Sequence, residues 1–236
     1  MSVTLLSWDA PGPYAVAFST RGGGVSEGSF DSLNLGLLTH DEAGNVDENR
    51  RRLCEATGAD PARLAMNRQV HAATVNRAEA GERGREGDGL WSDERGVPML
   101  KVTADCLPIA LARRNGEKPA LALLHAGRLG LLQGIVESGV EALGGKLAAV
   151  VGPGIGPCCY EVGEDIADTY RARFGAEALR GRNLDLWTVA ERLLRAAGVE
   201  SVERLDLCTA CDPVRFFSHR RDGPVTGRQG VIGYVA

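Results

Sequence analysis

The residues with the clearest chemical potential are one thiol and two imidazoles that lie far apart in the chain. Cys106 lies in the segment TADCLP, His125 begins HAG after an apolar run, and His71 ends QVH. Two imidazoles and one thiolate can bind a zinc ion and leave one coordination position open, which is typical of a catalytic zinc site. A cysteine nucleophile with a histidine base would use the same residues. Both interpretations predict an enzyme.

The ligand types, rather than their spacing, indicate which metal such a site would hold. The three residues are much farther apart in sequence than the ligands of zinc fingers. A soft thiolate with two imidazoles suits zinc or copper and disfavours magnesium and calcium. A multicopper oxidase needs many histidines, and this chain has only 4. We therefore expect Zn²⁺ in preference to copper.

Length and composition are those of an ordinary globular protein. The chain has 236 residues, of which 44% are hydrophobic and 25% charged, with a formal net charge of −4. No linker divides it, so we expect one domain over residues 1–236. The basic residues form no long run, which predicts no nucleic-acid partner and leaves small molecules as partners. The oligomeric state is not indicated.

The chain carries no pattern that would place it in or across a membrane. No window approaches the roughly 20 apolar residues that cross a bilayer, so we expect no membrane partner. The first residues lack the basic start and apolar stretch of a signal peptide. The 6 cysteines are then expected to be reduced thiols, which predicts a cytoplasmic location.

The hydrophobic pattern predicts more strands than helices, without strict alternation. Apolar runs predict strands near residues 4–8, 15–20, 64–70, 74–78, 99–103, 108–112, 120–125, 147–151, 203–207, 215–218 and 229–235. Helical spacing predicts helices over 46–57, 132–143 and 186–197. Such a pattern favours an α/β fold, a single-domain layered sandwich of mixed sheets flanked by helices, over a doubly wound parallel sheet.

Four further cysteines occur as two pairs. Cys158 and Cys159 end the segment GPGIGPCC, in which two prolines remove amide donors, so we interpret it as a rigid pocket wall and not a phosphate loop. Cys208 and Cys211 have the spacing of half a zinc ribbon or of a redox pair. Neither the partner cysteines nor a βαβ context is visible, so a structural role is expected for both pairs.

Three polar positions are candidates for binding a substrate. Arg21, followed by three glycines, and Arg220 could bind an anionic group, because a guanidinium matches phosphate geometry. Gln69 lies two residues before His71, on the same strand face if the strand continues, and could orient that histidine or the substrate.

Several segments, taken in order, resemble the YfiH-like family, also called the multicopper polyphenol oxidase or laccase-domain family and described as purine nucleoside phosphorylases. The segments are STRGGGVS, SLNLG, QVH, TADCLP, HAG, GPGIGPCCYE, FFSHRRD and TGRQ, and they cover nearly the whole chain. The resemblance implies a single-domain layered α/β sandwich. It also implies that His71, Cys106 and His125 bind zinc and carry catalysis, with Arg21, Asn34, Gln69 and Arg220 as substrate-binding residues.

The same resemblance implies an activity. The family's substrates are adenosine, inosine, guanosine and methylthioadenosine, cleaved with phosphate, and adenosine is also deaminated in the same site. This chain departs from the family where HAG is followed by Arg128-Leu129-Gly130 instead of Trp-Arg-Gly, and where Ala72 replaces a glycine. One helical position is a turn of about 100°, so Arg128 is expected to point away from the family arginine's place.

Two other functions use the same residues. A cysteine hydrolase, such as an amidase acting on a cell-wall precursor, would have Cys106 as nucleophile and a histidine as base. A non-enzymatic nucleotide-binding protein with a degenerate site would be consistent with the altered loop after His125.

Overall fold

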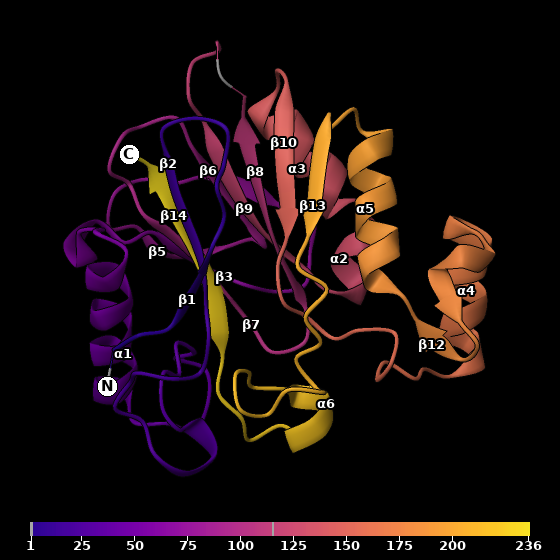
Figure 1. The fold of residues 1–236 in the computed structure, drawn as a ribbon, viewed down its shortest axis with the longest axis horizontal. Coiled ribbons are helices and arrows are strands. Elements are labelled where there is room, and N and C mark those ends of the chain that lie inside the picture. The colour runs from indigo at the N-terminus through magenta and orange to yellow at the C-terminus, as the bar shows by residue number, and fades with distance from the viewer. Residues whose placement is uncertain (1, 115) are drawn as a thin grey trace.

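Two β-sheets pack face to face between helices in the computed structural model, which describes residues 2–114 and 116–236 (Figure 1). The first sheet is antiparallel, in the order β1-β2-β14-β7, with bounds β1 Leu5–Ser7, β2 Tyr14–Ser19, β7 Met99–Thr103 and β14 Gln229–Val235. The second is mixed, in the order β13-β10-β8-β9-β6-β4, with bounds β4 Val75–Arg77, β6 Gly89–Ser92, β8 Leu107–Arg113, β9 Leu121–Ala126, β10 Leu147–Val151 and β13 Ser201–Arg204. Only its outer pairs, β13 with β10 and β4 with β6, are parallel within the described chain.

Helices cover the outer faces of both sheets. Helix α1, Ala43–Ala56, packs on the first sheet, and α2, Arg128–Gln133, α3, Ile135–Leu143, and α5, Leu186–Ala196, lie on the second (Figure 1). The remaining elements are α4 Glu164–Phe174, α6 His219–Asp222, the parallel pair β3 Met66–Arg68 and β5 Arg83–Glu86, and the small hairpin of β11 Leu179–Arg180 and β12 Asn183–Leu184. The predicted layered α/β sandwich with mixed sheets is therefore confirmed.

The strands of the second sheet are apolar on both faces because both faces are covered. In β9, Leu121 and Leu123 pack between the two sheets, whereas Ala122 and Leu124 pack against the helices. Strands β8 and β10 alternate in the same way, which is why their sequences read as continuous apolar runs.

Several predicted elements differ in the structure. Residues 215–218 form no strand: Arg215 ends a turn, and Asp212 accepts the N–H of Arg215 on its side chain and that of Phe216 on its carbonyl. The single helix predicted over 132–143 is two helices, broken at Gly134, whose φ of 92° lies in the left-handed region. Helix α4 and strands β5 and β6 were not predicted.

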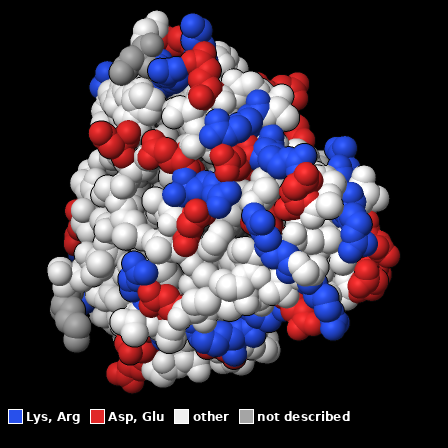
Figure 2. All heavy atoms as spheres, turned by 45° about the vertical axis from the view of Figure 1, so that its right-hand side comes forward, with Lys and Arg blue, Asp and Glu red and all other residues white. Residues whose placement is uncertain are grey.

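The surface mixes the two signs of charge. Figure 2 shows lysine and arginine side chains interspersed with aspartate and glutamate over the face it presents. Ion pairs account for part of this mixing, such as Arg195 with Glu191 at 2.9 Å on α5. Over residues 2–114 and 116–236, no helix combines the length and the apolar character needed to cross a membrane.

Candidate metal centre

The antiparallel pairing of β8 and β9 brings Cys106 beside His125. Leu107 pairs with Ala126 and Pro108 with His125, so the residue just before β8 lies next to the end of β9. The neighbours of His125 along the strand, Leu124 and Ala126, pack on the helix side. Strand alternation therefore points the His125 ring to the side between the two sheets.

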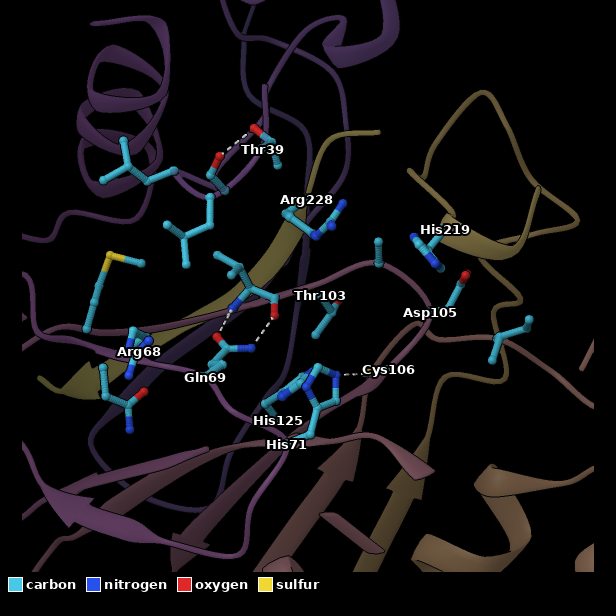
Figure 3. Close-up of a pocket in the computed structure, with 18 of the residues that line it drawn as sticks. Thr39, Arg68, Gln69, His71, Thr103, Asp105, Cys106, His125, His219 and Arg228 are labelled. Atoms are coloured by element: carbon cyan, nitrogen blue, oxygen red, sulfur yellow. Dashed lines mark hydrogen bonds between the residues drawn. The ribbon is translucent and has the colours of Figure 1, made fainter. Parts of the chain in front are cut away.

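His71 reaches the same place from the loop between β3 and β4. Its Nε2 lies 3.9 Å from Cys106 Sγ, and its ring centroid lies 4.9 Å from that of His125 at an interplanar angle of 72°. One ligand atom from each of the three residues lies within 4.8 Å of the other two (Figure 3). The three predicted ligands thus converge on one point.

The loop that carries His71 and the loop that carries Cys106 each contain an unusual backbone conformation. His71 has φ of 60° and Asp105, just before Cys106, has φ of 82°, in the left-handed region that non-glycine residues seldom adopt. Such conformations persist where the surrounding contacts over-determine them, and they cluster at functional sites.

Asp88 is the residue that positions both histidines. Its carboxylate is fully buried, and Oδ1 lies 2.7 Å from His125 Nδ1. The same carboxylate accepts backbone N–H groups of Val70 (3.0 Å), His71 (3.1 Å) and Ala72 (2.8 Å). His125 Nδ1 donates to Asp88, which leaves its Nε2 free to bind a metal ion, as in carboxylate–histidine–zinc arrangements.

The ionisation of this pair suits a metal ligand. Burial is the main cause that lowers the pKa of His125, so the imidazole is neutral and has a free lone pair. Burial by itself would raise the pKa of Asp88, but hydrogen bonds from His125 and from the N–H of Ala72 lower it to about 2.

The surroundings of Cys106 require a cation if the thiol is to ionise. Burial, with the charges of Asp105 and Asp88, raises its pKa to about 12. A bound metal ion would reverse this, because coordinated thiols lose their proton. Two imidazoles and a thiol within reach of one point fit a zinc ion with an open fourth position.

Gly127 leaves space for this cluster. A Cβ added to it would lie 2.7 Å from Cys106 Sγ and 3.3 Å from His71 Cδ2. Since the glycine has an ordinary extended φ of −81°, the close approach and not its backbone angle explains why no side chain fits there.

The three residues lie in the wall of a cavity of about 760 Å³. Figure 3 shows Arg228 and His219 on the side opposite the two histidines. The cavity wall also includes Gln69, Thr103, Arg128, Tyr160 and Arg220. A cavity of this size is in the range of small-molecule sites.

Two of the predicted substrate-binding residues lie in this wall. Gln69 also joins the histidine loop to β7, because its Nε2 donates to the carbonyl of Val102 (2.8 Å) and its Oε1 accepts the Val102 N–H (2.9 Å), as Figure 3 shows. The guanidinium of Arg220 lies 4.9 Å over the Tyr160 ring, and one of its N–H groups donates to the carbonyl of Glu161.

The other two predicted residues, Arg21 and Asn34, lie outside the set of described residues that line the cavity. Arg21 donates to the carbonyls of Asp31 and Pro213 and lies 4.5 Å over the Phe217 ring. Asn34 is fully buried and accepts the N–H of Arg228. Their substrate-binding role stays a prediction; Asn34 contacts the cavity only indirectly, through its bond to the backbone of Arg228.

Sequence reasoning missed Asp88, Thr103 and Arg228. Thr103 Oγ1 is buried and has no hydrogen-bond partner within the part of the chain that the structure describes. Arg228 is half-buried, which lowers its pKa, and lies in the wall through its contact with Asn34. Asp88 stands between two glycines, Thr103 begins the motif TADCLP, and Arg228 belongs to the motif TGRQ; these are the signals that the sequence offers for them.

Comparison with known proteins gives consistent relatives. A family model described as multi-copper polyphenol oxidoreductase laccase matches residues 15–235. The chain is 40% identical to a purine nucleoside phosphorylase of Pseudomonas aeruginosa, over 94% of this chain and 93% of the relative. It is 35% identical to the purine nucleoside phosphorylase YfiH of Escherichia coli over the same shares.

Solved structures agree with this. A Neisseria meningitidis protein superposes with a TM-score of 0.89 at 30% identity, covering 100% of this chain and 99% of that one. YlmD of Geobacillus stearothermophilus gives a TM-score of 0.87 at 32% identity, covering 94% and 92%. The chain therefore belongs to the YfiH-like family of multi-copper polyphenol oxidoreductase laccases, as its motifs predicted.

Proposed function

We propose that this protein is a zinc-dependent purine nucleoside phosphorylase that cleaves adenosine, inosine, guanosine or methylthioadenosine with phosphate and also deaminates adenosine. The observation that carries the proposal is the convergence of His71, Cys106 and His125 in the wall of one cavity of about 760 Å³. The names of the relatives from Pseudomonas aeruginosa and Escherichia coli support the phosphorylase assignment.

The cavity combines groups that suit the two halves of a nucleoside reaction. Arg128, Arg220 and Arg228 lie in the wall and offer guanidinium groups to a phosphate. Tyr160 lies in the wall with them and offers an aromatic ring to a purine.

In phosphorolysis, the bond between the ribose C1′ and the purine nitrogen breaks, and its electron pair leaves with the purine. A phosphate oxygen forms the new bond to C1′, and the purine nitrogen takes up a proton. Arginines that hold phosphate beside the ribose would reduce the entropic barrier and stabilise the charge. A zinc ion on His71, Cys106 and His125 would supply a Lewis acid beside the substrate.

A cysteine hydrolase remains the second candidate, because His71 Nε2 lies 3.9 Å from Cys106 Sγ. Burial, together with the two carboxylates near Cys106, raises the pKa of this thiol and disfavours its thiolate unless a cation is bound. The metal site is therefore the better supported use of this thiol. A reducing cytoplasm suits either proposal, because the thiol must stay reduced.

The direct test uses the purified protein with inosine and with adenosine, in the presence and absence of phosphate. We expect hypoxanthine or adenine together with ribose 1-phosphate only when phosphate is present, and slow formation of inosine from adenosine. Metal analysis of the same sample should find zinc. Base release that needs no phosphate would contradict the phosphorylase assignment.

Two treatments separate the candidates. His125→Ala and a strong chelator should each abolish both activities, whereas a thiol nucleophile would survive metal removal. His40→Ala is a matched control, because His40 is exposed and lies outside the described lining of the cavity. Full activity of a metal-free protein would overturn the zinc proposal.

A further inference from the structure

We propose a second metal site, a structural zinc site formed by the four cysteines Cys158, Cys159, Cys208 and Cys211. One ligand atom from each lies within 4.8 Å of the other three. The site shares no residue with the cluster of His71, Cys106 and His125. The two cysteine pairs are far apart in the sequence. Only the fold shows that together they supply the four ligands of one site.

Two loops meet to form this cluster. One follows β10 and carries Cys158 and Cys159; the other follows β13 and carries Cys208 and Cys211. Because β10 and β13 are parallel neighbours, both loops leave the same end of the sheet (Figure 1). The contact continues beyond the strands as a parallel bridge between Gly154 and Cys208.

The sulfur positions are close to those of a tetrahedral tetrathiolate. Cys211 Sγ lies 3.4 Å from Cys158 Sγ and 3.3 Å from Cys159 Sγ. With zinc–sulfur bonds of about 2.3 Å, the sulfurs of a tetrahedral site are about 3.8 Å apart. Small shifts of these side chains would therefore bring the four sulfur atoms to bonding distance from one zinc ion. The Gly156 N–H already donates to Cys208 Sγ (3.2 Å), as backbone amides do toward negatively charged sulfur.

Other roles account for these thiols less well. Cys158 and Cys211 are exposed and Cys159 and Cys208 partly so, which does not fit the role of small core residues. A single disulfide from Cys211 to either neighbour would leave two thiols of the cluster without a role. Four thiols around one point form a closed set, which is typical of structural zinc, whereas the histidine cluster keeps a position open.

The four-cysteine zinc site would stabilise the wall of the cavity that contains His71, Cys106 and His125. Tyr160, which lies in the cavity wall, directly follows Cys159. Thr209 directly follows Cys208 and donates its hydroxyl to Asp105 Oδ1 at 2.6 Å, next to Cys106. A metal ion bound by both cysteine loops would therefore fix the relative positions of two parts of that wall.

Counting bound zinc tests the proposal without an activity assay. The full chain, purified without chelator, should hold two zinc ions. His71→Ala with His125→Ala should remove one ion, and Cys208→Ser with Cys211→Ser should remove the other. Cys54→Ala is the matched control and should keep both, because Cys54 belongs to neither described cluster.

A spectroscopic measurement keeps the test valid if the double cysteine variant folds poorly. The His71→Ala, His125→Ala chain loaded with cobalt(II) should show the intense sulfur-to-metal charge-transfer bands of a tetrathiolate, and Cys211→Ser alone should weaken them. A chain that holds one zinc ion, lost entirely in the histidine variant, would overturn the proposal. So would a denatured, metal-free chain whose mass is lower by two hydrogens, if peptide mapping places the disulfide between two of these four cysteines.

Discussion

The Asp88 carboxylate lies 2.7 Å from His125 Nδ1 while it also accepts the backbone N–H of His71 at 3.1 Å. One buried side chain thus orients the ring of one proposed metal ligand and the backbone of another. The sequence separates Asp88 from both histidines, so this relationship exists only in the folded chain.

Replacing Asp88 should weaken metal binding more than it weakens the fold. In Asp88→Asn, the amide oxygen can still accept from His125 and from the N–H of His71, but the NH₂ group that replaces Oδ2 cannot accept the N–H groups of Val70 and Ala72. Loss of such a supporting carboxylate typically costs 10- to 100-fold in metal affinity or activity, and we expect a loss of about that size. Zinc competition with a chromophoric chelator would measure it.

The control for this variant is Asp93→Asn, which removes a carboxylate of the ion pairs with Arg77 and Lys118. Those partners are exposed, so zinc affinity should not change. Unchanged zinc affinity in Asp88→Asn would contradict the positioning role.

A side chain at position 127 should disturb the ligands directly. In Gly127→Ala, the new methyl group would lie 2.7 Å from Cys106 Sγ, so the sulfur has to move. We expect lower zinc affinity, with activity reduced at least about tenfold, since small misplacements of reacting groups are costly. Gly44→Ala is the matched control, because a Cβ there meets nothing within 4 Å. Full zinc loading and activity in Gly127→Ala would show that the cluster tolerates the shift.

The Thr103 hydroxyl should contribute nothing to the stability of the fold. It is buried without a partner among the described residues, so Thr103→Val removes an unsatisfied group and should leave the thermal midpoint unchanged or higher. If the hydroxyl bonds the substrate, KM should rise by up to about tenfold, the equivalent of one hydrogen bond of about 1.4 kcal/mol. Thr169→Val, on exposed α4, should change neither quantity. An unchanged KM would exclude Thr103 from substrate binding.

Lys101 should make stability depend on pH. Burial lowers its pKa from 10.5 to about 7, against the opposing charge of Asp88. Between these two values the unfolded chain binds more protons than the folded chain, so the free energy of unfolding rises with pH above about 7. The slope from this group is at most about 1.4 kcal/mol per pH unit.

The test compares the free energy of unfolding of the unaltered protein with that of Lys101→Met. Both are measured by denaturant unfolding between pH 7 and 9, at the same metal content. The variant should be the more stable protein at pH 7, and its advantage should shrink as pH rises. A constant difference across this range would contradict the assigned shift. Lys118→Met, at an exposed ion pair with Asp93, should show no such trend.

The sequence alone determined the layered fold and the residue types of the main site. Apolar residues predicted β7, β10 and β14 with the observed bounds, and the signal is uninterrupted in β10, which is buried on both faces. It also identified His71, Cys106 and His125, because a thiol and imidazoles at strand ends form a recognisable chemical set and the motifs around them resemble a family.

Only the tertiary structure decided which distant groups meet. Asp88 meets His125, and Asn34 meets Arg228, only in the folded chain, and the two cysteine pairs become neighbours because β10 and β13 are adjacent and parallel. Local periodicity carries no information about such partners, because sheet order and loop packing are set by how whole faces are buried. For the same reason, the apolar pattern of residues 215–218 wrongly predicted a strand. Phe216 and Phe217 are buried, but they follow a turn that hydrogen bonds to Asp212 stabilise, and they pair with no strand of the described chain.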